Sequence, residues 1–181
     1  MQSHTKIIDV TLKSNKLCLS VFNEGDLQNI YEGLSNADVI KYYGVSYNTL
    51  ESAKAQLHWF TNLQEQGEGI WWAVYSAKDN TFYGAIGLNN FSKQHLKVEI
   101  GFWLLPEFWG KGIVSEAIKL VSNYAFNSLN VNRIEAFVES ENENSSKVLV
   151  KTGFNYEGTM VKCEIKKSKF IDIAIYALLK L

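Results

Sequence analysis

The residues best suited to chemistry in this chain lie in the stretch EIGFWLLPEFWGKGIVSEA, residues 99–117. Its first part is an apolar run that ends at Pro106, the single proline among 181 residues. Because proline lacks a backbone N–H and keeps the preceding residue extended, strand pairing is expected to stop here. The backbone amides and carbonyls of Trp103, Leu104 and Leu105 then need a partner other than a neighbouring strand.

A glycine-rich turn follows the proline and leads into a helix. Gly110 and Gly112 flank Lys111, and apolar residues then recur every four positions from Ile113 to Ala125, which predicts an amphipathic helix. The first N–H groups of a helix have no internal partner, and the helix dipole favours an anion there. Glycines let a phosphate approach the backbone. This combination suits acyl-coenzyme A, which carries two amides in its pantetheine arm and a pyrophosphate in its tail.

The proline and the glycines also have a simpler interpretation, which stays open at this point. They can merely make a tight connection between a strand and a helix. The patterns of other glycine loops fit less well. Ser115 stands where a dinucleotide-binding fingerprint has its third glycine, and Lys111 is followed by Gly112 rather than by the Ser or Thr of a nucleoside-triphosphate loop.

The composition is that of a globular protein, with 46% hydrophobic and 20% charged residues. Because the formal net charge is −1 and no long run of like charges occurs, we expect no nucleic-acid partner. Cys18 and Cys163 are expected to be reduced thiols, and His4, His58 and His95 lie too far apart in sequence for a metal site. The N-terminal stretch resembles neither a signal peptide nor a membrane span, so we expect a cytoplasmic protein without a membrane partner.

The apolar pattern predicts a mixed α/β chain. A capping arrangement of Asn48 and Glu51 is expected to open a helix that ends near Gln66, before a glycine suited to the left-handed conformation. The other expected helices cover residues 24–34, 113–127 and 144–153. The expected strands cover residues 6–12, 16–22, 70–76, 81–91, 95–105, 133–139 and 169–181.

Two stretches, VEIGFWLLPEFWGKGIVSEAIKLVSNYAF and NRIEAFVESENENSSKVLVKTGFNYEG, resemble the GNAT superfamily of acyl-CoA-dependent N-acyltransferases. The resemblance is greatest to the branch that acetylates the N-termini of ribosomal proteins. It runs from Leu17 to Leu179 and is strongest from Val98 to Gly158. It implies a single GNAT acetyltransferase domain over residues 1–181. Its fold would be a central twisted, mostly antiparallel sheet of about seven strands with a splay after the fourth, flanked by about four helices.

The resemblance also implies acetyl-CoA as co-substrate, with no metal, and a set of residues that bind it. Backbone N–H groups of the turn and helix start would hold the pyrophosphate, the splayed strand would pair with pantetheine, and an Asn and a Ser of the later helix would contact the cofactor arm. Val114 is a mild departure from the usual last residue of the phosphate turn. The implied binding residues are Trp103, Leu104, Leu105, Trp109, Gly110, Lys111, Gly112, Ile113, Val114, Ser115, Asn142 and Ser145.

Three residues are candidates for catalysis by the same resemblance. Glu99 matches a strand glutamate that acts as general base, with a surface or core-edge ion pair as its alternative. Glu164 matches a second proposed base, with a surface strand-end position as its alternative. Ser145 would assist the leaving thiolate, or else only cap the short helix. Leu149 stands where many relatives have a tyrosine for that purpose, and Asn142 is alternatively only a turn former.

The predicted function is transfer of an acetyl group from acetyl-CoA to a primary amine, directly and in a ternary complex. A protein N-terminus is the preferred acceptor, and a small amine such as a polyamine or an aminoglycoside is the second choice. A non-catalytic acyl-CoA sensor and a nucleotide-binding protein are the competing classes. A homodimer is left open.

Overall fold

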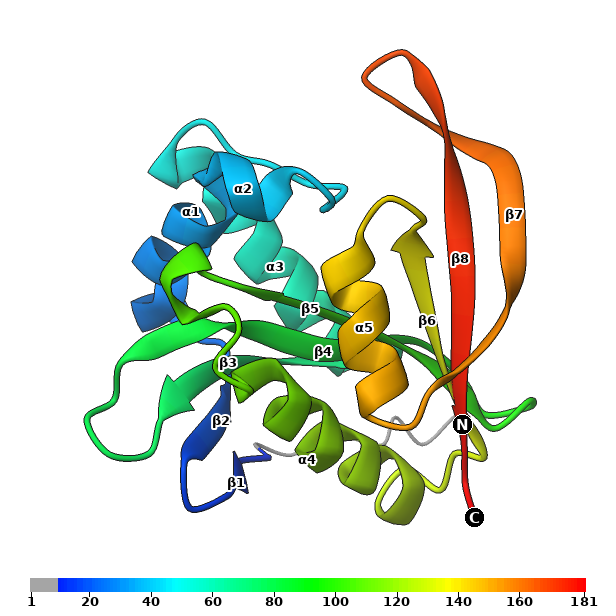
Figure 1. The fold of residues 1–181 in the computed structure, drawn as a ribbon. Coiled ribbons are helices and arrows are strands. Elements are labelled where there is room, and N and C mark those ends of the chain that lie inside the picture. The colour runs from blue at the N-terminus through cyan, green and yellow to red at the C-terminus, as the bar shows by residue number, and fades with distance from the viewer. Residues whose placement is uncertain (1–9) are drawn as a thin grey trace.

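A mixed sheet that is antiparallel except for one pair of strands forms the centre of the structure, a computed structural model that describes residues 10–181 (Figure 1). The strands lie in the order β1-β2-β3-β4-β5-β6-β8-β7. They are β1 (Leu12–Lys13), β2 (Leu17–Val21), β3 (Ile70–Ser76), β4 (Phe82–Ser92), β5 (Lys97–Leu104), β6 (Arg133–Glu139), β7 (Asn155–Lys166) and β8 (Lys169–Leu179). The helices are α1 (Leu27–Ser35), α2 (Ala37–Ile40), α3 (Leu50–Gln66), α4 (Ile113–Asn127) and α5 (Glu143–Lys151), with 3₁₀ turns at Glu24–Asp26 and Pro106–Phe108.

This architecture confirms the expected mixed α/β fold and adds one strand and one helix to it. The helix is α2, which has only four residues. The strand is β7, an edge strand that is exposed along most of its length and therefore lacks the alternation that marks a half-buried strand. Of the strand expected over residues 6–12, residues 6–9 lie outside the described residues. None of the helices in residues 10–181 is both long and apolar enough to cross a membrane.

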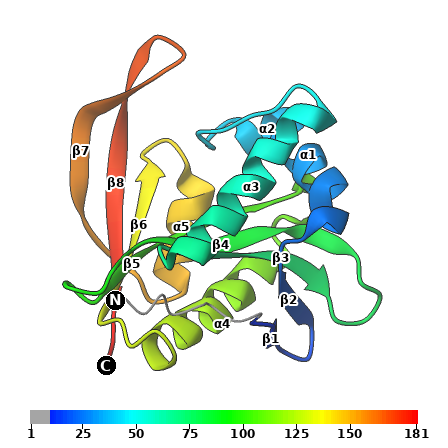
Figure 2. The same ribbon diagram turned by 180° about the vertical axis from the view of Figure 1, so that it is seen from behind.

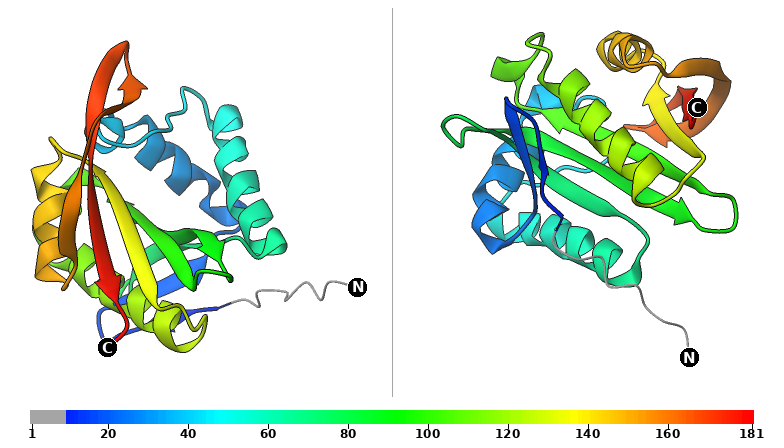
Figure 3. Two further views of the ribbon diagram at one scale, coloured as in Figure 1. Left: turned by 90° about the vertical axis from the view of Figure 1, so that its right-hand side faces the viewer. Right: turned by 90° about the horizontal axis from the view of Figure 1, so that it is seen from below.

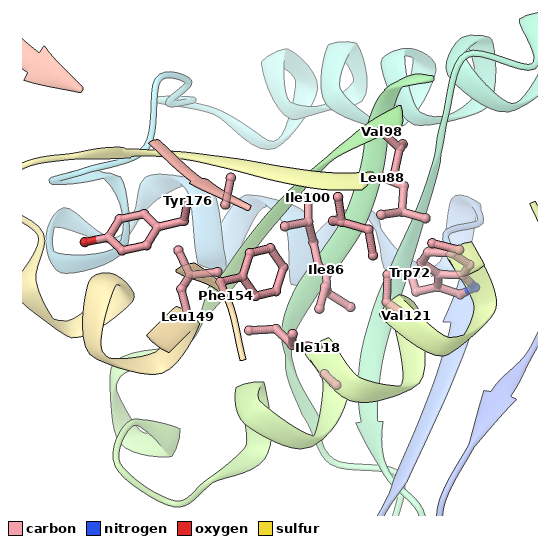
Figure 4. Packing of buried hydrophobic residues seen from close by; sticks show 14 of the residues in the cluster. Trp72, Ile86, Leu88, Val98, Ile100, Ile118, Val121, Leu149, Phe154 and Tyr176 are labelled. Carbon is pink, nitrogen blue, oxygen red and sulfur yellow. The ribbon is translucent and has the colours of Figure 1, made fainter. Parts of the chain in front are cut away.

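The helices cover both faces of the sheet and so create two hydrophobic cores. Helices α4 and α5 pack on one face, where Trp72, Ile118 and Leu149 are fully buried (Figure 4). Helices α1 to α3 lie on the other face (Figure 2), over a core that includes Trp71 and Trp103. Neighbouring residues of β3 point to opposite faces, which is why Trp71 and Trp72 belong to different cores.

Helix α3 begins and ends with recognisable caps. Its N-cap is Thr49, whose hydroxyl accepts a hydrogen bond from the Ser52 backbone amide, so the expected cap at Asn48 and Glu51 is wrong by one residue. A Thr-Ser pair forms the reciprocal bonds here that the sequence pattern assigns to Asn and Glu. The expected glycine end is confirmed: Gly67 has a φ of 69°.

Strands β5 and β6 are paired only at one end. Their parallel ladder joins Lys97, Val98 and Glu99 to residues 133–135, and beyond these three pairs the strands diverge although both continue. This is the expected splay, although it follows the fifth strand of the structure, β5, and not the fourth. Figure 1 shows β6, β8 and β7 turning away from the rest of the sheet beyond this point. The divergence exposes backbone groups of β5 that no strand satisfies.

An ion-pair network lies at the paired end of the splay. Glu135 of β6 accepts hydrogen bonds from Lys97 of β5 at 2.9 Å and from Arg133 at 2.8 Å, and Arg133 also binds Glu157 of β7. Partial burial alone would raise the pKa of Glu135, but hydrogen bonds from Arg133 and Lys97 outweigh it and keep that pKa below its ordinary value. The network therefore holds together the strands that part a few residues later.

Glu135→Gln is expected to destabilise the protein by about 1–2 kcal/mol at pH 7, since it removes a charged acceptor of two hydrogen bonds. Because the folded pKa of Glu135 is depressed, its contribution is present above the unfolded pKa and is lost as the pH falls through the folded pKa. The difference between wild type and variant should therefore shrink below about pH 4.

Urea unfolding between pH 3 and pH 7 measures this effect. Glu65→Gln, at an exposed position of α3, is the matched control and should cause no loss. A Glu135→Gln variant as stable as wild type at pH 7 would contradict the role of the network.

Candidate functional site

The start of α4 offers unpaired backbone donors to the solvent. Gly112 is its N-cap, with a φ of 77° and no side chain to cap the helix, and the first bond of the helix runs from the Glu116 amide to the Gly112 carbonyl at 3.2 Å. The amides of Ile113, Val114 and Ser115 precede that bond and have no partner within the helix. A Cβ at Gly110 or Gly112 would meet nothing within 4 Å. The space in front of these donors is open to an anion.

The free edge of β5 belongs to different residues from those expected. The Leu105 amide donates to the Tyr83 carbonyl of β4 at 2.9 Å, and the Trp103 carbonyl lies 2.2 Å from where a Cβ on Gly84 would be. Backbone groups of alternate residues point to opposite sides of a strand. Trp103 and Leu105 therefore face β4, which corrects the expectation that their backbones are unpaired. Phe102, which was not predicted from the sequence, and Leu104 face the side that β6 has left.

A hydrogen bond from Trp109 connects the glycine turn to β5. The Trp109 indole N–H donates to the Leu104 carbonyl at 2.8 Å, so this acceptor on the free edge is already satisfied. The groups left for a ligand are the amide and carbonyl of Phe102 and the amide of Leu104.

A groove of about 870 Å³ lies between the end of β5, the starts of α4 and α5, and the end of α2. All the expected cofactor-binding residues except Leu105 and Lys111 line it. The Lys111 ammonium instead lies 5.5 Å from the centre of the Phe108 ring. Lys147 and Lys151 also line this larger groove and were not predicted. Their spacing of four residues on a predicted helix places both on one face, which is the signal that could have found them.

A second groove, of about 510 Å³, lies between β5, β6, the β7–β8 hairpin and α3. Glu99, Glu139 and Glu164 line it together with Trp59 and Trp71. This smaller groove meets the larger one at five residues that line both: Tyr42, Tyr43, Phe102, Asn142 and Ser145. Two ligands can therefore approach one point from opposite sides.

The two candidate glutamates both reach the smaller groove but differ in their surroundings. Glu99 is partly buried and accepts a hydrogen bond from the Asn90 side chain at 2.8 Å, so its partner is an amide rather than the lysine of the alternative interpretation. Glu164 is exposed and lies opposite Ile171 of β8, just after a bulge in β7. Its carboxylate has no hydrogen-bond partner within residues 10–181.

Asn142 and Ser145 lie at the start of α5, where the two grooves meet. The Asn142 side chain accepts a hydrogen bond from the Ser145 amide at 3.2 Å, which makes Asn142 the N-cap and excludes that role for Ser145. The Ser145 hydroxyl makes no hydrogen bond to the described residues and is free for a ligand. Leu149, at the place of the missing tyrosine, is fully buried in the core and offers no proton.

Two tyrosines of the loop between α2 and α3 complete the junction. Tyr42 and Tyr43 line both grooves. Burial raises the pKa of Tyr43, charge repulsion from Tyr47 adds to the shift, and the indole of Trp103 acts in the opposite direction. The hydroxyl of Tyr43 therefore stays protonated at neutral pH. Neither residue was predicted from the sequence, because nothing in their spacing relates this loop to β5 or α5.

The family model of the acetyltransferase (GNAT) domain matches residues 16–155 of this chain. The chain therefore belongs to the GNAT acetyltransferases. It is an N-acetyltransferase that takes its acetyl group from acetyl-CoA and acts on an amine.

Three curated relatives are similar to this chain, and two of them are named for different acceptors. The uncharacterized N-acetyltransferase YoaA of Bacillus subtilis is 31% identical over 93% of this chain and 96% of its own length. The ribosomal-protein-serine acetyltransferase of Escherichia coli is 27% identical over 55% of this chain and 56% of its own. The spermidine N(1)-acetyltransferase of Escherichia coli is 32% identical over 43% of this chain and 42% of its own length.

Solved structures share the fold. A GNAT-family acetyltransferase from Bacillus anthracis has a TM-score of 0.83 at 27% identity, covering 94% of this chain and 98% of its own. RimL, a ribosomal L7/L12 α-N-protein acetyltransferase solved in complex with coenzyme A, has a TM-score of 0.85 at 19% identity over the same shares.

Gly112→Asp is expected to weaken acetyl-CoA binding about tenfold or more, because it places a carboxylate where the α4 amides face an anion. Gly112→Asn is the matched control, since Asn has the same shape, tolerates a positive φ and carries no charge. Calorimetric titration with acetyl-CoA measures both variants. Equal affinity of the Asp and Asn variants would show that no anion binds at this helix start.

Trp109→Phe is expected to lower acetyl-CoA affinity about fivefold, the equivalent of one lost hydrogen bond. The variant removes the indole N–H that donates to the Leu104 carbonyl, so the glycine turn loses its hydrogen bond to β5. The control is Trp59→Phe, because Trp59 is similarly exposed, at 40% against 45% for Trp109, and lines only the smaller groove. The same titration should show no change for this control; equal losses in both variants would contradict the role of Trp109.

Proposed function

We propose that this enzyme acetylates the N-terminal α-amine of a protein, by direct transfer within a ternary complex. The observation that carries the proposal is the junction of the two grooves at Phe102, Asn142 and Ser145. In this arrangement acetyl-CoA occupies the larger groove and the amine enters through the smaller one. The E. coli ribosomal-protein-serine acetyltransferase among the relatives supports an acceptor of this class.

Backbone groups would hold most of acetyl-CoA. The amides of Ile113, Val114 and Ser115 would face the pyrophosphate, and the free amide and carbonyl of Phe102 would pair with the pantetheine amides. Lys151 supplies positive charge along the same groove, whereas Lys147 there is paired with Glu143 at 3.0 Å. The side chain of Asn142 already caps α5 through its oxygen, which leaves its amide N–H groups for the cofactor arm.

In the reaction the amine nitrogen attacks the thioester carbon, the C–S bond breaks, and the thiolate leaves. The amine must first lose a proton, which costs about 1 kcal/mol near pH 7 for an α-amine but about four or more for a lysine. Glu99 or Glu164 would accept that proton directly or through water. The Leu104 amide would stabilise the carbonyl oxyanion, and the free Ser145 hydroxyl would donate a hydrogen bond to the departing thiolate.

A covalent acyl-enzyme is disfavoured by the positions of the thiols. Cys18 lies on β2 and Cys163 is exposed on β7, and neither lines a groove. Both are free within the described residues.

The carboxylates of the smaller groove bear on the choice between the two acceptor classes. A small polycation is the second candidate, because Glu99, Glu139 and Glu164 line the same groove, and a spermidine acetyltransferase is among the relatives.

Measuring the rate of thiol release from acetyl-CoA with different amines tests which class of amine is the acceptor. The panel contains N-terminal peptides, the same peptides with blocked N-termini, lysine peptides, spermidine and an aminoglycoside. We expect the highest kcat/KM with free N-terminal peptides. Higher kcat/KM with spermidine would establish the second candidate. If acetyl-CoA binds but no amine causes thiol release, the result would favour a non-catalytic acyl-CoA sensor. If ATP or NAD displaces acetyl-CoA, the result would favour a nucleotide-binding protein.

Replacing each glutamate by glutamine identifies the general base. We expect one of Glu99→Gln and Glu164→Gln to lower kcat at pH 7 by about tenfold or more, with partial recovery as the pH rises and the amine deprotonates unaided. Glu65→Gln, at an exposed position of α3, serves as the control. If neither variant loses kcat, neither glutamate is the base.

A further inference from the structure

Lys166, the last residue of β7, contacts two other parts of the site, the segment after α2 and the end of β6. Its ammonium donates to the Lys41 carbonyl at 2.5 Å and forms an ion pair with Glu139 at the end of β6. It also lies 5.8 Å from the centre of the Tyr42 ring. The side chains of Lys166 and Glu139 are only 21% and 15% exposed. Charge-assisted bonds with this degree of burial are stronger than surface pairs.

This contact holds the α2–α3 loop at one of its ends, together with a hydrogen bond from the Tyr43 amide to the Ile40 carbonyl at 3.3 Å and the packing of Tyr43 against the core. At the other end Tyr47 is fixed, since its amide donates to the Leu34 carbonyl at 3.0 Å and its hydroxyl to Gln56 at 3.1 Å. Lys41 is bound by Lys166, and the next two residues, Tyr42 and Tyr43, line both grooves. Figure 3 shows in its left view the β7–β8 hairpin beside the segment that joins α2 and α3.

The same contact sets the charge of the smaller groove. Three carboxylates line it, and Lys166 is the one lysine among its lining residues in the described part of the chain. Its ion pair with Glu139 leaves Glu99 and Glu164 as the carboxylates without an ion pair. These two are the candidate bases.

We propose that Lys166 is a positioning residue for the amine acceptor. By bonding Lys41 and Glu139, it holds the loop with Tyr42 and Tyr43 against the end of β6 and so completes the wall of the smaller groove at its junction with the larger one. This inference rests on the proposed function in one respect, namely that the amine enters through the smaller groove.

The other lysines of the hairpin do not share this arrangement and provide the control. Lys169 lies directly opposite Lys166 in the register of β7 and β8, is exposed, and forms no ion pair with the described residues. Lys166→Met and Lys169→Met therefore make the same change of charge at neighbouring points of one hairpin. Lys166→Arg keeps the charge and can remake the bonds.

The experiment combines steady-state kinetics with hydrogen exchange. We expect Lys166→Met to raise KM for the preferred amine about tenfold, with kcat and the KM for acetyl-CoA changed less than about threefold. Backbone amides of residues 41–48 should exchange faster in this variant. Lys169→Met should match wild type in every measurement, and Lys166→Arg should recover most of the affinity for the amine.

Each of the other possible results would contradict one specific part of the proposal. Unchanged exchange in Lys166→Met shows that the lysine does not hold the loop. Faster exchange with an unchanged amine KM shows that the loop does not position the acceptor. Equal effects of Lys166→Met and Lys169→Met would show that only the charge of the hairpin matters, and not the specific contacts of Lys166. If wild type acetylates no amine of the panel, the proposed function fails, and exchange alone still shows whether Lys166 holds the loop. A thermal melt of each variant excludes unfolding as the cause.

Discussion

The divergence of β5 from β6 is the constraint on which the rest of the structure depends, because it creates backbone groups that a ligand must satisfy. The strands pair over only three residues, next to the ion pairs of Lys97, Arg133 and Glu135. Past that point the free edge of β5 runs on to Leu104, and Pro106 prevents the strand from continuing. Unpaired amides inside a fold are costly, so this edge can be kept only at a place that solvent or a ligand reaches.

The helices on the two faces of the sheet turn this edge into a site with two entrances. On one face α4 and α5 both begin beside the larger groove, so that their amides face the same space. On the other face α3 contributes Trp59 to the smaller groove, and the β7–β8 hairpin contributes Glu164 and Lys166. The loop after α2 lies where the larger and the smaller groove meet. Under the proposed function, the order of the layers therefore separates recognition of the acyl donor from recognition of the acceptor.

Local sequence signals predicted the parts of the site made by adjacent residues, and failed where distant segments meet. Pro106, Gly112 and Asn142 each mark a turn or helix start with a known backbone requirement, and all three lie at the expected boundaries. Which side of β5 stays free depends on the register with β4, so the sequence assigned Trp103 and Leu105 to the free edge where the structure has Phe102 and Leu104. Tyr42, Tyr43 and Lys166 reach the site only through tertiary packing, which no spacing reveals.

In the proposed arrangement the acyl donor is bound mainly by backbone groups, at β5 and at the start of α4, whereas the acceptor is bound mainly by side chains. Main-chain amides survive most substitutions, since a change at Val114 or Phe102 alters the surface around a donor and leaves the donor in place. Side chains such as Glu164 can be exchanged one at a time. A scaffold of this kind conserves its chemistry under mutational drift while its choice of amine diverges, which is a physical reason why enzymes of one fold act on proteins in one lineage and on polyamines in another.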